Sequence, residues 1–169
     1  MMHKTTQEDI TIDNVWQKVD EDTRQQVISI WNNIGLKLSP DEANDRANQL
    51  VFVVRNQAKQ VVGMSTGFKA YLRQFKNHFY AIRLFIMPAY RKPGLSSKIL
   101  VLTRDFFEDI SRFDQDNTCI GVVTLVENER LKQYRNEAIW PASKMVYMGN
   151  SDKGHHIRVY YFKGSRISP

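Results

Sequence analysis

The chain of 169 residues is poor in the residues that cross-link or interrupt a fold. Cys119 is its only cysteine, so no internal disulfide can form. It has 5 prolines and 8 glycines, and we find no repeat, low-complexity segment or linker that would divide it. We therefore expect one domain over residues 1–169, with one hydrophobic core.

Long apolar runs are also missing. No stretch approaches the ~18 apolar residues that a membrane-spanning helix needs. The first residues, MMHKTTQEDITID, are polar and lack the apolar core of a secretory signal. A single cysteine suits a reducing compartment. The sequence thus predicts a cytoplasmic protein without a membrane partner.

Positive charge is in moderate excess. Lys and Arg number 24 against 18 Asp and Glu, which gives a net charge of +6. These charges are scattered, and no Lys- or Arg-rich tail or nucleic-acid motif is present. The excess therefore favours a small anionic ligand and makes nucleic acid an unlikely partner.

The most informative stretch is FYAIRLFIMPAYRKPGLSSKILVLTRDFFEDI, residues 79–110. Phe79–Met87 is almost entirely apolar, which is typical of a strand covered on both faces. Pro88 cannot donate to a sheet ladder, so the strand should end there. From Ser97 onward, the apolar side chains recur at helical spacing, which predicts an amphipathic helix over 96–110.

The turn between this strand and helix has the chemistry of an anion site. The first N–H groups of a helix are unpaired, and the helix dipole adds partial positive charge there. Arg91 and Lys92 add two cations, while Gly94 and Ser96 keep the approach free of bulk. We expect a phosphate-bearing ligand at residues 91–97.

The remaining elements are predicted from periodicity and from turn and cap residues. We expect a weak first strand near 10–12, helices at 20–34, 39–49, 96–110 and 127–139, a hairpin of strands 50–55 and 61–73, a strand at 119–126 parallel to 79–87, and a terminal hairpin of strands 144–148 and 156–162.

The segment Ile86-x-Pro88-x-Tyr90-Arg91-x-x-Gly94-x-Ser96-Ser97 resembles the acyl-coenzyme A signature of the GNAT superfamily of N-acetyltransferases. The resemblance implies an α/β fold of the α+β type, with a mixed, mostly antiparallel twisted sheet flanked by helices. It also implies direct transfer of an acetyl group from acetyl-CoA to a primary amine. Ser96 replaces the usual last Gly or Ala, and Pro93 removes one N–H from the turn.

The resemblance also implies the site. The two parallel strands should separate at their C-terminal ends, with pantetheine bonded to the first strand and pyrophosphate to the turn. The implied cofactor-binding residues are Leu84, Phe85, Ile86, Arg91, Lys92, Gly94, Leu95, Ser96, Ser97 and Asn128.

The catalytic groups are less clear, because Phe79–Met87 carries no carboxylate. The general base is then Glu127 at the end of the second parallel strand, His78, or a water chain. Tyr134 is the candidate acid for the leaving thiolate. It lies one residue from the position where the family has its tyrosine, so a core aromatic is the alternative.

No metal site is predicted, since the adjacent His155 and His156 should point to opposite faces of a strand. The amine acceptor and the acyl chain stay open, and a homodimer is possible. Two other functions also stay open: a non-catalytic acyl-CoA-binding protein, and a basic module that binds a partner or nucleic acid.

Overall fold

The computed structural model describes residues 9–115 and 118–169. Two compact units can be distinguished. The first holds the residues up to Thr66 together with Phe85–Arg91, and the second holds Gly67–Leu84 and Lys92–Pro169. The single domain expected from the sequence stays a prediction.

Seven strands form one mixed sheet in the order β1-β2-β3-β4-β5-β7-β6. The β4–β5 pair is parallel, whereas β1–β2, β2–β3, β5–β7 and β6–β7 are antiparallel. This confirms the predicted α/β fold with a mostly antiparallel sheet and helices. The strands are β1 (Thr11–Asn14), β2 (Leu50–Arg55), β3 (Val61–Leu72), β4 (Asn77–Ile86), β5 (Cys119–Val126), β6 (Val146–Asn150) and β7 (His156–Tyr161).

The first two helices begin at the residues that the sequence marks as starts. Asp20 accepts from the amide of Thr23 at 2.7 Å, and Ser39 forms a capping box with Glu42. The helices are α1 (Glu21–Asn33), α2 (Pro40–Ala47), α3 (Leu95–Phe113) and α4 (Glu129–Tyr134), with a short 3₁₀ turn η1 (Pro88–Tyr90).

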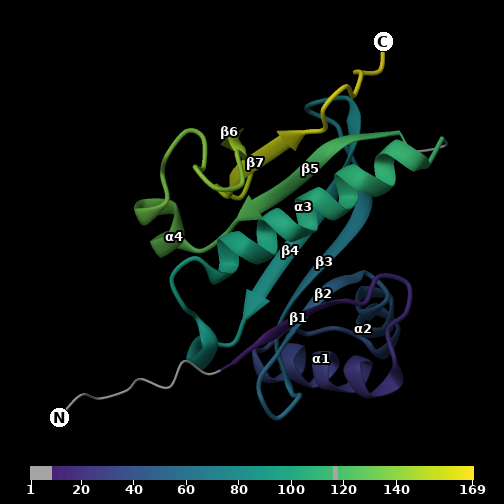
Figure 1. The fold of residues 1–169 in the computed structure, drawn as a ribbon. Coiled ribbons are helices and arrows are strands. Elements are labelled where there is room, and N and C mark those ends of the chain that lie inside the picture. Colours follow the sequence, from purple (N-terminus) through teal and green to yellow (C-terminus); the bar gives the residue numbers. More distant parts are fainter. Residues whose placement is uncertain (1–8, 116–117) are drawn as a thin grey trace. The chain divides into compact units, whose positions relative to one another are not determined.

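In the first unit, one face of α1 supplies much of the core. Val27, Ile30 and Trp31 are buried with residues of β2 and β3 such as Val53 and Met64. Figure 1 shows α1 and α2 beside β1 and β2. The spacing that predicted this helix is confirmed only in part, since Ile34, which it counted on the buried face, is 46% exposed.

In the second unit, α3 lies along one face of β4 and β5 (Figure 1). Tyr80 of β4 stacks on Phe107 of α3, with ring centroids 4.2 Å apart. Neighbouring residues on a strand point to opposite faces. Accordingly, Phe79 belongs to a separate apolar cluster with Ile120, Val123, Ile157 and Val159 on the face away from α3.

The prediction of a helix from 127 to 139 was wrong about its length, since α4 ends at Tyr134. Beyond it, side chains bind the backbone carbonyls that a longer helix would use. Trp140 donates its indole N–H to the carbonyl of Arg135 at 2.8 Å, and Arg158 donates to the carbonyls of Glu137 and Ala138. These bonds hold the segment in an extended path, so tertiary contacts override the local helical pattern.

The first strand of the terminal hairpin is shifted from its predicted position, whereas the second begins at His156 as predicted. β6 begins at Val146 rather than 144, because Lys144 has a φ of +60° and donates its amide to the carbonyl of Trp140.

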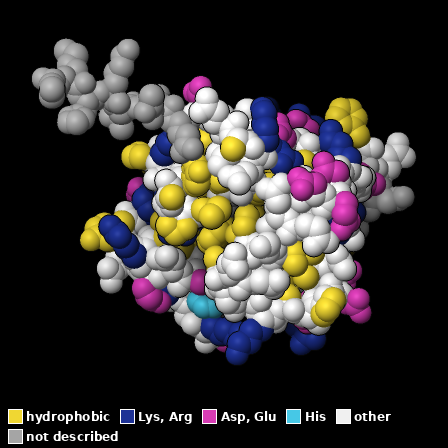
Figure 2. All heavy atoms as spheres, turned by 90° about the horizontal axis from the view of Figure 1, so that it is seen from below, with side chains coloured by type: hydrophobic (Ala, Val, Ile, Leu, Met, Phe, Trp, Pro, Cys, Tyr) yellow, Lys and Arg dark blue, Asp and Glu magenta, His cyan; other side chains and the backbone are white. Residues whose placement is uncertain are grey.

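No helix in the described parts of the chain is both long and apolar enough to cross a membrane. Some apolar side chains are nevertheless exposed, and Figure 2 shows a face where they gather, with Lys and Arg at its margins.

Candidate functional site

The pairing of the parallel strands β4 and β5 stops before their C-terminal ends. Their pairing runs from His78↔Cys119 to Ala81↔Val123, whereas β4 continues to Ile86 and β5 to Val126. Along its other edge, β5 is paired with β7 from Gly121 to Val126. The hydroxyl of Thr124 donates to the carbonyl of Ile82 at 3.0 Å, at the point where the strands part. The resemblance predicts a splay of the two strands beyond this point, and the end of the pairing is the observation that agrees with it.

The end of β4 carries the residues predicted to bond pantetheine, Leu84, Phe85 and Ile86. In the first unit, the carbonyl of Ile86 accepts a hydrogen bond from Nε of Arg91 at 2.9 Å. The Arg91 guanidinium also lies 5.8 Å from the centre of the Phe85 ring. Arg91 therefore points back to β4, whereas the sequence assigned it to the phosphate turn.

The N-terminus of α3 differs from those of the other described α-helices. α1, α2 and α4 are capped by the side chains of Asp20, Ser39 and Asn128, whereas Gly94 offers α3 no side-chain cap. The first turn of α3 also has no acidic residue. An uncapped turn leaves backbone donors and the positive end of the dipole open to an anion.

The predicted turn residues lie in order at this helix start. Gly94 has a φ of +82°, a left-handed conformation that glycine adopts at little cost. Leu95 is buried and its amide donates to the carbonyl of Lys92 at 3.2 Å. Ser96 is exposed and Ser97 half-buried, so the outer side of the turn is open to solvent.

Asn128 lies two residues after the end of β5 and caps α4. Its side-chain oxygen accepts from the amide of Leu131 at 3.0 Å. Glu127, the candidate base, is exposed between β5 and this cap. His78, the other candidate base, pairs with Cys119 at the opposite end of the parallel strands from the splay.

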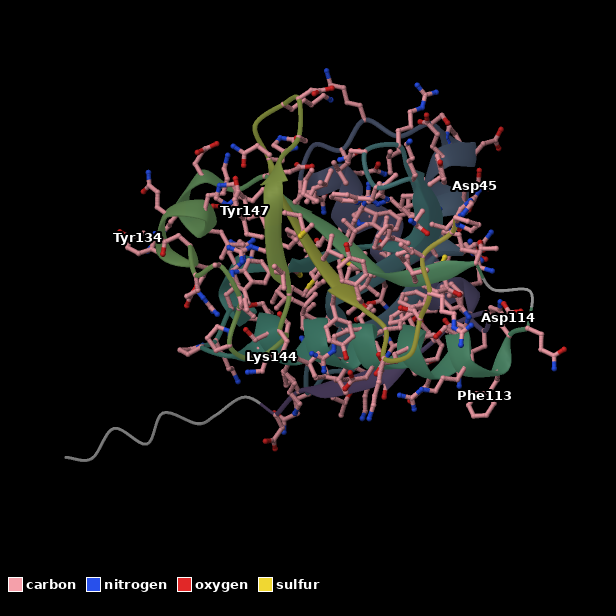
Figure 3. The ribbon with its side chains drawn as sticks, turned by 90° about the horizontal axis from the view of Figure 1, so that it is seen from above. Asp45, Phe113, Asp114, Tyr134, Lys144 and Tyr147 are labelled. Carbon is pink, nitrogen blue, oxygen red and sulfur yellow. The ribbon has the colours of Figure 1, made fainter. Side chains whose placement is uncertain are left out.

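Tyr134 is the last residue of α4 and is 71% exposed. Figure 3 shows it on the outer side of that helix. Its ring lies 5.7 Å from the guanidinium carbon of Arg130. The alternative of a buried core aromatic is therefore wrong, and its hydroxyl is open to solvent.

Arg83 is a residue of this region that the sequence reasoning did not single out. It lies two positions after Ala81, so it points to the face of β4 away from α3. Its guanidinium lies 4.7 Å from the centre of the Phe68 ring. Burial lowers the pKa of Arg83, and the negative charge of Glu127 opposes that shift. The alternation along β4 was the signal that could have revealed it.

Histidines do not gather near the splay. His156 packs against Tyr147 with ring centroids 5.1 Å apart, and its Nδ1 is buried without a hydrogen-bond partner. Within the described ranges, no group of three His, Cys, Asp or Glu side chains is arranged to hold a metal ion.

No family model matches the sequence, and no curated protein matches it. Solved structures do match. The chain has the fold of the GNAT acetyltransferases. A GNAT superfamily phosphinothricin acetyltransferase from Sinorhizobium meliloti, in complex with AcCoA, is 10% identical with a TM-score of 0.66. The match covers 94% of this chain and 93% of that one.

Two further structures illustrate the range of proteins with this fold. The ribosomal-protein-S5-alanine acetyltransferase from Vibrio fischeri is 12% identical, with a TM-score of 0.62 and coverage of 95% of this chain and 97% of that one. AtaTR bound with AcCoA is 13% identical, with a TM-score of 0.61 and coverage of 92% and 94%. At such identities the likeness shows the fold alone.

Proposed function

We propose that this chain binds acetyl-CoA and transfers its acetyl group directly to a primary amine. The observation that carries the proposal is the separation of β4 and β5 past Ala81 and Val123. Beyond this point, the facing edges of the two strands are not paired with each other and would take an extended thioester arm. The uncapped start of α3 in the segment after β4 supports the proposal, because it suits a pyrophosphate.

The cofactor would contact residues within the stretch 84–97 and, after β5, Asn128. Leu84, Phe85 and Ile86 would offer backbone groups to pantetheine, and Arg91 would have to release the carbonyl of Ile86. Lys92, Gly94, Leu95, Ser96 and Ser97 would surround the pyrophosphate. Asn128 would keep α4 beside the end of β5.

In the transfer step, the neutral amine nitrogen attacks the thioester carbonyl carbon. The new C–N bond forms, the C–S bond breaks, and the thiolate of coenzyme A leaves and takes up a proton. Holding both reactants in place supplies much of the rate. Glu127 is the proposed base that removes the proton from the ammonium, and Tyr134 the proposed acid that protonates the thiolate.

A non-catalytic acyl-CoA-binding protein is the second candidate. It is favoured by the exposure of Tyr134 at the end of α4 and by the bond between Arg91 and the carbonyl of Ile86. Such a protein would bind acetyl-CoA and turn over no amine. A cytoplasmic location and a homodimer stay predictions.

Calorimetric titration with acetyl-CoA tests the proposal, with adenosine diphosphate and a short oligonucleotide as controls. Micromolar binding of acetyl-CoA, followed by release of free thiol with at least one amine of a panel, is the expected result. Binding without thiol release would favour the second candidate. Absence of binding at millimolar ligand would overturn both and direct attention to macromolecular partners.

A further inference from the structure

A cavity of about 550 Å³ opens in the second unit, between the turn that joins β3 to β4 and the hairpin of β6 and β7. Its apolar lining is Phe75, Met148 and Ile157. Phe75 and Ile157 pack in the cluster with Phe79 and Val123, on the face of the sheet away from α3. The volume falls within the range of about 300–1,000 Å³ that is usual for small-molecule sites.

The β7 side of the cavity lies level with the end of the β4–β5 pairing, whereas its β3–β4 side lies beside the start of β4. Ile157 of β7 pairs with Leu125, two residues past Val123, which is the last residue of β5 paired with β4. In the proposed function, the start of α3 takes the pyrophosphate of the cofactor. The opposite face of the splay is then the side from which an acceptor amine reaches the thioester.

Two opposite charges line this cavity. Arg73 comes from the β3–β4 turn and Asp152 from the β6–β7 hairpin, and both side chains are exposed. Several exposed charges of the described chain are ion-paired, but neither of these two has an ion pair. Both are therefore available to a ligand that brings its own charges of both signs.

The side-chain amide of Asn150 also lines the cavity. Its oxygen accepts from the hydroxyl of Tyr147 at 2.8 Å, which leaves its NH₂ group to donate. Ser151 holds the hairpin turn, because its hydroxyl oxygen accepts from the amide of His155 at 3.1 Å. These hydrogen bonds hold the β6–β7 turn, which carries Asp152, in place.

We propose that this cavity binds a free α-amino acid with an apolar side chain as the acetyl acceptor. Asp152 pairs with the α-ammonium group and Arg73 with the α-carboxylate, and the apolar side chain packs on Phe75, Met148 and Ile157. The inference rests on the proposed function, whose transfer step then yields the N-acetyl amino acid and free coenzyme A. A peptide N-terminus shares the ammonium group but lacks the adjacent carboxylate.

Acetyl transfer to four related compounds distinguishes these ligands. Thiol release is measured with leucine, leucinamide, the dipeptide Leu-Gly and isoamylamine, which share one alkyl chain. We expect leucine to have a kcat/KM about tenfold to a hundredfold above the other three, as the loss of a charge-assisted contact predicts. Equal rates with leucinamide, Leu-Gly or isoamylamine would overturn the carboxylate contact.

Variants test which side chains bind the amino acid. Arg73→Gln and Asp152→Asn should each raise the KM for leucine about tenfold to a hundredfold, because each removes one charged partner. Asp45→Asn in α2 and Arg166→Gln near the C-terminus alter exposed charges outside the cavity lining and should leave this KM unchanged. Figure 3 labels Asp45. An unchanged KM in both lining variants would overturn the inference.

The failures of the two proposals can be told apart. All four variants lie outside the proposed cofactor residues and should bind acetyl-CoA like the unmodified chain. If acetyl-CoA binds but leucine is neither acetylated nor bound in the presence of coenzyme A, only the cavity inference fails. If acetyl-CoA does not bind, the proposed function fails first.

Discussion

Arg158 is the charged side chain that the fold buries most completely. It is 1% exposed and donates to the backbone carbonyls of Arg135, Glu137 and Ala138. Its guanidinium also lies 4.4 Å from the centre of the Trp140 ring. Burial lowers its pKa, and Glu137 opposes that shift. This one side chain thus fixes the path from α4 to β6.

Replacing Arg158 by Met should lower the free energy of unfolding by about 2–4 kcal/mol, because the charge-assisted hydrogen bonds from the guanidinium to three carbonyls are lost. Urea unfolding measures the change, and Arg112→Met on the exposed side of α3 is the matched control. A loss below about 0.5 kcal/mol would mean that water replaces the guanidinium in this loop.

Two substitutions of Gly94 separate the effect of backbone strain on stability from the effect of bulk and charge on ligand binding. Its φ is +82°, yet a Cβ would meet no atom within 4 Å. Gly94→Ala should therefore cost about 1 kcal/mol of stability through backbone strain and leave acetyl-CoA affinity nearly intact. Gly94→Glu adds bulk and negative charge and should abolish binding in calorimetry. Equal affinities for both variants would show that the pyrophosphate is bound elsewhere.

At the scale of elements, β3 and α3 approach closely through Gly67. A Cβ there would lie 2.3 Å from two ring atoms of Phe107. Gly67→Ala should therefore lower the free energy of unfolding by about 1–3 kcal/mol. Phe107→Leu alone should also destabilise, since Phe107 is fully buried. In the double variant the two losses should be less than additive, whereas strict additivity would contradict this contact.

α4 carries the prediction for the proposed acid. Tyr134→Phe should lower turnover by about tenfold to a hundredfold and leave acetyl-CoA affinity unchanged, because only the proton donor is removed. Tyr71→Phe on β3, which alters another exposed tyrosine, is the matched control. Unchanged turnover in Tyr134→Phe would remove Tyr134 from the mechanism and point to water as the acid.

The sequence predicted some elements far better than others. In the stretch 79–110, the strand was found as a continuous apolar run and the helix by its period of 3.6, because burial leaves both patterns in the residues themselves. The end of α4 was missed because it depends on Arg158, which lies more than 20 positions further along the chain. The pattern of apolar residues in a short stretch of sequence contains no information about a contact with a distant residue.

In the candidate site, too, some features could be predicted from the sequence and others could not. The glycine of the turn was predictable, because its left-handed φ is a local requirement. The partner of Arg91 was not, because its bond to the carbonyl of Ile86 depends on how η1 folds back toward β4. Arg83 was overlooked as a break in an apolar run, although strand alternation places it on the face away from α3.

At the scale of the whole molecule, fold and sequence identity are only loosely connected. Identities of 10–12% accompany TM-scores of 0.62–0.66 over more than nine-tenths of the chain. Many different side chains can satisfy the same pattern of buried and exposed positions, since cores tolerate hydrophobic exchange when volume is kept. Function depends on few positions, so it has to be tested on the residues of this chain.

The stability of the whole chain should fall in alkali through two buried groups. Burial raises the pKa of Tyr80 from 10.0 to about 12 and that of Cys119 from 9.0 to about 11. Both groups stay protonated in the folded chain at pH values where they ionise in the unfolded chain. Unfolding then releases protons, so the free energy of unfolding decreases as pH rises from about 8.5 through 11.

Urea unfolding at pH 8 and pH 11 measures this dependence. We expect a loss of about 3–4 kcal/mol from these two groups. The double variant Tyr80→Phe with Cys119→Ala should lose correspondingly less over this interval, whereas Tyr71→Phe should behave like the unmodified chain, because Tyr71 is exposed. If the double variant lost as much stability between the two pH values as the unmodified chain, ionisation elsewhere would account for the alkaline transition.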